Sequence, residues 1–60
     1  MNEVIKILMN RDGLTYEEAR EEYEITQEEI LESIADGYGD VEDILLGNLG
    51  LEMDYIFAFI

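Results

Sequence analysis

Residues 15–36 read TYEEAREEYEITQEEILESIAD, and this stretch decides the fold. Thr15 and Glu18 are spaced as the capping box that starts a helix, and Leu14 with Ala19 can form the accompanying hydrophobic staple. At 3.6 residues per turn, one side of this helix is apolar, its members lying within about 60° of one another. This apolar side consists of Tyr16, Ala19, Tyr23, Ile30 and Ile34, flanked by Leu31.

Two lengths remain open for this helix. Asp36 and Gly37 end it, because glycine commonly follows the last helical turn, and this favours one continuous helix of about five to six turns. However, Thr26 and Glu29 form a second capping box, and Ile25 points away from the apolar side. A break at Ile25 is therefore the alternative.

Glycines divide the rest of the chain into shorter segments. Residues 2–10 predict a first helix that is apolar almost all round, with a strand as the alternative because three of its apolar residues are β-branched. Asp40 is expected to cap a third helix that runs to about Asn48 and is ended by Gly50. Residues 52–59 predict a last short helix. The inward side of the third helix consists of Val41, Ile44, Leu45 and Leu49.

These elements predict an all-α fold, a small bundle of three to four helices with one long acidic amphipathic helix, in a single domain of residues 1–60. The alternative is an α+β fold in which the N- and C-terminal segments pair as strands. The apolar residues 55–60 are expected to pack on the first helix and complete the core. A homodimer seam or a partner contact is the alternative use of this end.

The charge of the chain is far from balanced. The net charge is −13, and residues 21–60 hold twelve carboxylates but no basic residue. A net charge of roughly 2–8 in magnitude already keeps a small domain in solution, so the excess needs a reason outside the fold. Direct binding to nucleic acid or to a membrane surface is not expected, since both would repel this chain. We expect a cytoplasmic protein, because cysteine is absent and no membrane span is found.

Catalysis is not expected either. The chain lacks histidine and cysteine, and its few hydroxyl groups have no evident base beside them. Carboxylates are so numerous that no pair is singled out for acid–base chemistry, and no motif indicates a cofactor or a metal site.

Nine carboxylates occupy an arc of about 160° on the long helix, opposite its apolar side. We call this arc the acidic face. At 1.5 Å per residue it carries one negative charge per ~3.2 Å, close to the ~3.4 Å of a nucleic-acid strand. An ordinary solvated face mixes lysine with glutamate. This face does not, and the absence of lysine favours a partner-binding role. The acidic face consists of Glu17, Glu18, Glu21, Glu22, Glu24, Glu28, Glu29, Glu32 and Asp36.

Several short segments together resemble small acidic proteins of bacteriophages and mobile elements. They are GLTYEEA (13–19), ILE (30–32) with Gly37, DIL (43–45), and LGLE (49–52) followed by Asp54 and Tyr55. Within that setting the chain looks like an anti-CRISPR or a related DNA mimic. The resemblance implies a bacterial host cytoplasm and a target that is a cationic nucleic-acid-binding protein or complex, with a CRISPR effector favoured.

Two functions are therefore expected from the sequence. The first is an inhibitor whose acidic face blocks the cationic DNA-binding channel of a bacterial defence complex, with Glu21, Glu22, Glu28, Glu29 and Glu32 as central contacts. The alternative is a small helical interaction or regulatory module that binds through its apolar C-terminal end.

Overall fold

A computed structural model describes residues 2–37 and 39–60. The described chain is an all-α bundle without strands, so the α+β alternative is wrong. The long axis measures 33 Å and the other two 17 Å each. Its helices are α1 (Glu3–Asp12), α2 (Tyr16–Ala35), α3 (Val41–Leu49) and the 3₁₀ helix η1 (Met53–Ala58).

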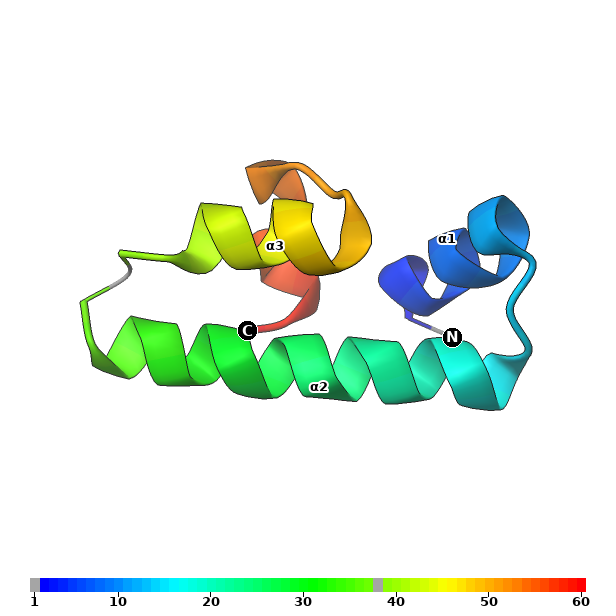
Figure 1. Ribbon diagram of the computed structural model, residues 1–60, viewed down its shortest axis with the longest axis horizontal. Helices are drawn as coiled ribbons and strands as arrows, with labels where there is room; N and C mark the ends of the chain where they lie inside the picture. Colours follow the sequence, from blue (N-terminus) through cyan, green and yellow to red (C-terminus); the bar gives the residue numbers. More distant parts are fainter. Residues whose placement is uncertain (1, 38) are drawn as a thin grey trace.

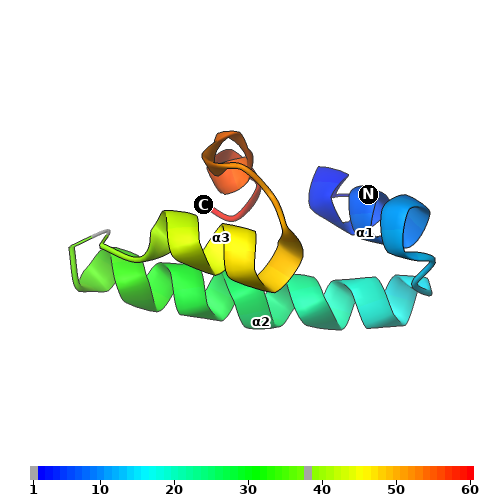
Figure 2. The ribbon, with the colours of Figure 1, turned by 45° about the horizontal axis from the view of Figure 1, so that its top comes forward.

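The helices are arranged around α2. Figure 1 shows that α2 runs the length of the molecule and that α1 and α3 follow one another along the same side of it. Figure 2 shows η1 beyond α3, and Figure 1 shows the chain returning from η1 to the side of α2. Within the described part of the chain, no helix is both long and apolar enough to cross a membrane.

The long helix is continuous, which confirms the preferred length and rejects the break at Ile25. Its capping box forms as predicted: Glu18 N donates to Thr15 Oγ1 at 3.2 Å, and Thr15 N donates to the Glu18 carboxylate at 2.9 Å. Thr26 does not act as a cap. It is 1% exposed and its hydroxyl faces α3, so its side chain serves helix packing instead.

The first helix ends two residues later than predicted. Asn2 caps it, its Oδ1 accepting a hydrogen bond from Val4 N at 2.7 Å. The helix then continues past residue 10 to Asp12 and stops at Gly13, where φ is 68°. The left-handed conformation of Gly13 ends the helix, whereas the polar residues Arg11 and Asp12 before it are still helical.

The core draws on every helix. The buried side of α2 is rotated by about 40° from the predicted stripe, toward Thr26 and Ser33. Tyr16, at the edge of the predicted stripe, is consequently exposed, whereas Ala19 and Ile30 are buried as expected. The buried apolar residues are Val4, Ile5, Leu8, Ala19, Ile30, Val41, Leu45, Leu49, Leu51, Ile56 and Phe59.

The third helix differs from the prediction in its first turn. Asp40 occupies the N-cap position, but its side chain makes no capping hydrogen bond. Its backbone N instead donates to Ser33 Oγ at 3.1 Å, which ties the start of α3 to α2. The helix ends one residue later than predicted, at Leu49, and Gly50 with φ 65° terminates it as expected.

The C-terminal end completes the core only in part. Ile56 and Phe59 are buried, and Asn2 Nδ2 donates to Ala58 O at 3.3 Å, so this end packs against α1 as predicted. Phe57 and Ile60 point outward, and Phe57 is 82% exposed. Residues three apart lie on the same side of a 3₁₀ helix. Ile56 and Phe59 are therefore buried together, whereas Phe57 between them points outward.

Candidate partner-binding face

All nine residues of the acidic face are exposed, as the sequence predicts. Charged side chains avoid burial unless they are paired, so the packing of α1 and α3 on the opposite side of α2 leaves the whole arc to solvent. Eight of the nine lie on the 20-residue helix α2, which begins at a formed capping box, and Asp36 is its C-cap. The carboxylates are therefore displayed in a fixed order along one continuous helix.

Three of these carboxylates are engaged within the protein. Glu18 closes the capping box, Glu24 lies 3.5 Å from Arg20, and Glu29 accepts a hydrogen bond from Asn48 at 3.1 Å. In residues 2–37 and 39–60 the structure gives no side-chain partner to the other six, which are Glu17, Glu21, Glu22, Glu28, Glu32 and Asp36.

The edge of the acidic face beside α3 is hollowed. One hollow of about 280 Å³ is bounded on α2 by Glu22 and Glu29, with Ile25 between them. A second, of about 290 Å³, continues along the same edge and is bounded by Glu29, Glu32 and Asp36. The acidic face thus borders a shallow groove between α2 and α3, and Glu29 lines both of its hollows.

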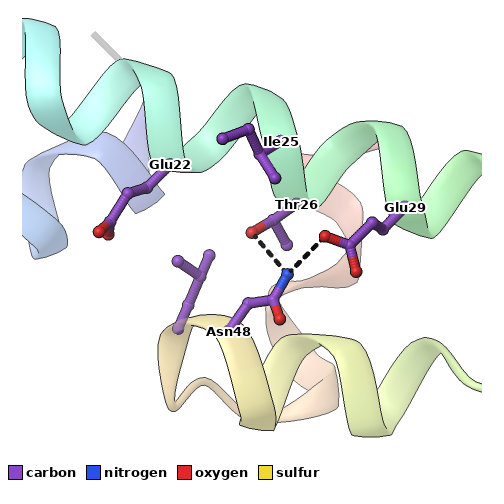
Figure 3. A pocket seen from close by; sticks show the side chains of 6 residues that line it. Glu22, Ile25, Thr26, Glu29 and Asn48 are labelled. Carbon is purple, nitrogen blue, oxygen red and sulfur yellow. Dashed lines mark hydrogen bonds between the residues drawn. The ribbon is translucent and has the colours of Figure 1, made fainter.

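Figure 3 shows the first hollow from close by. The Asn48 amide reaches from α3 between Thr26 and Glu29, donating to the Thr26 hydroxyl at 3.3 Å and to the Glu29 carboxylate at 3.1 Å. Ile25 stands on the α2 side of this hollow and is 51% exposed. One amide therefore satisfies a buried hydroxyl and also fixes the position of a surface carboxylate.

The sequence did not identify Thr26, Ser33 and Asn48 as bridging residues. A signal was present, because Thr26 and Ser33 fall in the same arc as Ala19 and Ile30. A small polar residue on a buried arc needs a partner, so such positions indicate a contact with a neighbouring helix.

Two of the three cations reach only the N-terminal half of the acidic face. Arg20 pairs with Glu24. The charge of Glu22 adds to the rise in the pKa of Arg11 that Asp12 causes. Arg11 Nη2 donates to Leu49 O at 2.6 Å, and the guanidinium binds Asp12 with its Nε 2.8 Å from the carboxylate. This bond to Asp12 raises the pKa of Arg11 and lowers the pKa of Asp12. Beyond Arg20, every charged side chain of α2 is negative. The field along the rest of the helix is therefore not compensated locally.

The chemistry that this face offers is the acceptance of hydrogen bonds and the attraction of cationic groups. Among the described residues, no three carboxylates come together in an arrangement that could hold a metal ion. Lysine and arginine side chains match an array of separated carboxylates, because each cation can pair with a single carboxylate while the neighbouring carboxylates stay hydrated.

No protein family model matches the chain, and neither does any curated protein or solved structure.

Proposed function

We propose that this protein is a nucleic-acid mimic of phage type, which inhibits a bacterial defence complex by occupying its cationic DNA-binding channel. A CRISPR effector is the favoured target, in line with the resemblance of the sequence to anti-CRISPR proteins. The observation that carries the proposal is the exposure of nine carboxylates on one side of a single continuous helix and its C-cap.

The charge density of the whole molecule supports the same proposal. A net charge of −13 along a 33 Å axis amounts to about one charge per 2.5 Å, between the ~3.4 Å of one DNA strand and the ~1.7 Å of the duplex. A channel lined by lysine and arginine to hold nucleic acid would meet a field of similar strength. Association is then fast and strongly salt-dependent, because steering and counterion release both come from the charge.

The proposal also accounts for a cost to the fold. Like charges at i,i+4 on α2, such as Glu24 with Glu28 and Glu28 with Glu32, each destabilise a helix by roughly 0.2–0.5 kcal/mol. Stability of small domains is only several kcal/mol, so these costs are noticeable. A cationic partner relieves the repulsion on binding.

The test uses two variants that remove the same charge from different places. The first, Glu21→Gln/Glu28→Gln/Glu32→Gln, neutralises acidic-face residues that have no side-chain partner in the described part of the chain. The matched control, Glu42→Gln/Asp43→Asn/Glu52→Gln, neutralises three exposed carboxylates outside α2. Circular dichroism checks that both variants remain helical.

Wild-type protein is immobilised and used to capture proteins from a bacterial lysate at low salt, with elution at high salt. Each captured protein is then tested for binding to labelled DNA in competition with the free wild-type chain and with both variants. We expect stoichiometric competition by wild type, a loss of about tenfold for the α2 variant, and little change for the control. Equal losses in both variants, or captured proteins that do not bind nucleic acid, contradict the proposal.

A further inference from the structure

The 3₁₀ helix η1 sorts its side chains onto three edges, because residues three apart are eclipsed in this geometry. Ile56 and Phe59 share the edge that is buried in the core. Asp54 and Phe57 share the edge that faces solvent, where Phe57 is 82% exposed, and Ile60, just beyond η1, is exposed as well. An aromatic ring held outward on an ordered helix is not used by the core.

This outward edge borders a hollow between the two ends of the described chain. The hollow measures about 270 Å³ and is lined by Asn2 and Glu3 from α1 and by Asp54, Tyr55, Phe57 and Ala58 from η1. It therefore combines two aromatic residues of η1 with one carboxylate residue from each of the two helices. No α2 residue lines it.

Two observations decide what could cover this surface. A stable dimer buries about 800 Å² on each partner, whereas Phe57 and Ile60 together offer a few hundred Å² of apolar surface at most. A second copy would also bring another net charge of −13 against this one. Area and charge both argue against a homodimer and favour a small cationic occupant.

We propose that the hollow between η1 and the start of α1 is a docking site for a basic segment of a partner protein, in which an apolar side chain is flanked by lysine or arginine. The apolar side chain enters beside Tyr55 and Phe57, and the flanking cations pair with Glu3 and Asp54. An arginine also suits the exposed face of the Phe57 ring, through a cation–π contact. This second surface does not depend on the nucleic-acid mimicry of α2.

The experiment selects ligands from a displayed library of random short peptides, with the full chain as bait at an ionic strength of about 0.15 M. Peptides that also bind the Phe57→Ser chain are removed by subtraction. Because Phe57 is exposed, this substitution leaves the core intact. We expect the remaining peptides to share an aromatic or aliphatic residue next to lysine or arginine.

The affinity of a selected peptide is then measured by fluorescence anisotropy for a set of full-length variants. Phe57→Ser should weaken binding about tenfold or more, the size of a hot-spot truncation. Glu3→Gln/Asp54→Asn should weaken it several-fold and reduce its dependence on salt. Leu46→Ser, which removes an exposed apolar residue of α3, should have little effect.

Several outcomes overturn the inference. One is the absence of any peptide that prefers wild type to the Phe57→Ser bait. Another is a selected peptide that loses as much affinity to the α2 variant Glu21→Gln/Glu28→Gln/Glu32→Gln as to Phe57→Ser, since it then binds the acidic face and leaves only the proposed function standing. A third is a wild-type dimer in analytical ultracentrifugation that Phe57→Ser dissociates, because the occupant is then a second copy.

Discussion

The ring of Tyr23 in α2 stacks on the ring of Phe59, with centroids 4.7 Å apart and planes inclined by 22°. Polar contacts surround this pair: the Tyr23 hydroxyl donates to Ala58 O, and Gln27 Nε2 donates to Phe59 O at 3.0 Å. The middle of the longest helix and the C-terminal end of the described chain are thereby joined by apolar and polar contacts together. This junction should contribute strongly to the stability of so small a core.

Substitution of Phe59 by alanine tests the importance of this junction. Phe59 is 2% exposed, so Phe59→Ala should lower the free energy of unfolding by about 3 kcal/mol or more, a large part of the stability of a small domain. Urea denaturation followed by circular dichroism measures the change. The matched control is Phe57→Ala, which should change the stability by about 0.5 kcal/mol or less because Phe57 is exposed. Similar effects of the two substitutions would contradict the assigned packing of η1.

The Asn48 bridge predicts coupling between α2 and α3. Asn48→Ala leaves the buried Thr26 hydroxyl without its donor and should cost about 1–2 kcal/mol. In a Thr26→Val background, where that hydroxyl is absent, the same Asn48→Ala change should cost clearly less. A double-mutant cycle from urea melts measures the difference. Additive effects would mean that the hydrogen bond contributes nothing to stability.

Neutralising the acidic face should make the isolated protein more stable. Glu21→Gln/Glu28→Gln/Glu32→Gln removes three i,i+4 repulsions of α2, which predicts a gain of about 0.5–1.5 kcal/mol. Added salt should raise the melting temperature of wild type more than that of this variant, since salt screens the same repulsion. Thermal melts at low and high ionic strength test both statements. A variant less stable than wild type at low salt would show that these carboxylates support the fold.

The pairing of Arg11 with Asp12 predicts a pH dependence confined to acid. The hydrogen bond from Arg11 lowers the pKa of Asp12 below its ordinary value of 3.8. A carboxyl group with a lowered pKa stabilises the folded state above its unfolded pKa, and this stabilisation is lost as the pH falls through the folded value. The stability of wild type relative to Asp12→Asn should therefore be constant near neutrality and decrease below about pH 4. Melting temperatures of both proteins across this range measure it, and a parallel course at all pH values would contradict the pairing.

Local signals in the sequence were sufficient for much of the fold. Thr15 and Glu18 predicted the start of α2 because a capping box depends only on neighbouring residues. Gly50 predicted the end of α3 because its left-handed conformation excludes most other residues. The exposure of the acidic face followed from the high cost of burying charge, which hardly depends on the arrangement of neighbouring helices.

Features that depend on how helices meet were less predictable. Tyr16 is exposed because the buried arc of α2 is set by where α1 and α3 cross it and not by hydrophobicity alone. Phe57 is exposed because the last segment forms a 3₁₀ helix, whose period the sequence pattern does not reveal. The Asn48 bridge depends on the register between α2 and α3. Such contacts are tertiary and have no signature in a single segment.

The burial of Phe59 also has a consequence for how the protein folds. Its ring meets Tyr23, which lies far earlier in the sequence, so this part of the core forms only when two distant segments come together. Contacts of long sequence separation slow folding, because the loop between them must close before they form. We therefore expect the folding rate to be limited by the docking of residues 53–59 and not by the formation of the individual helices.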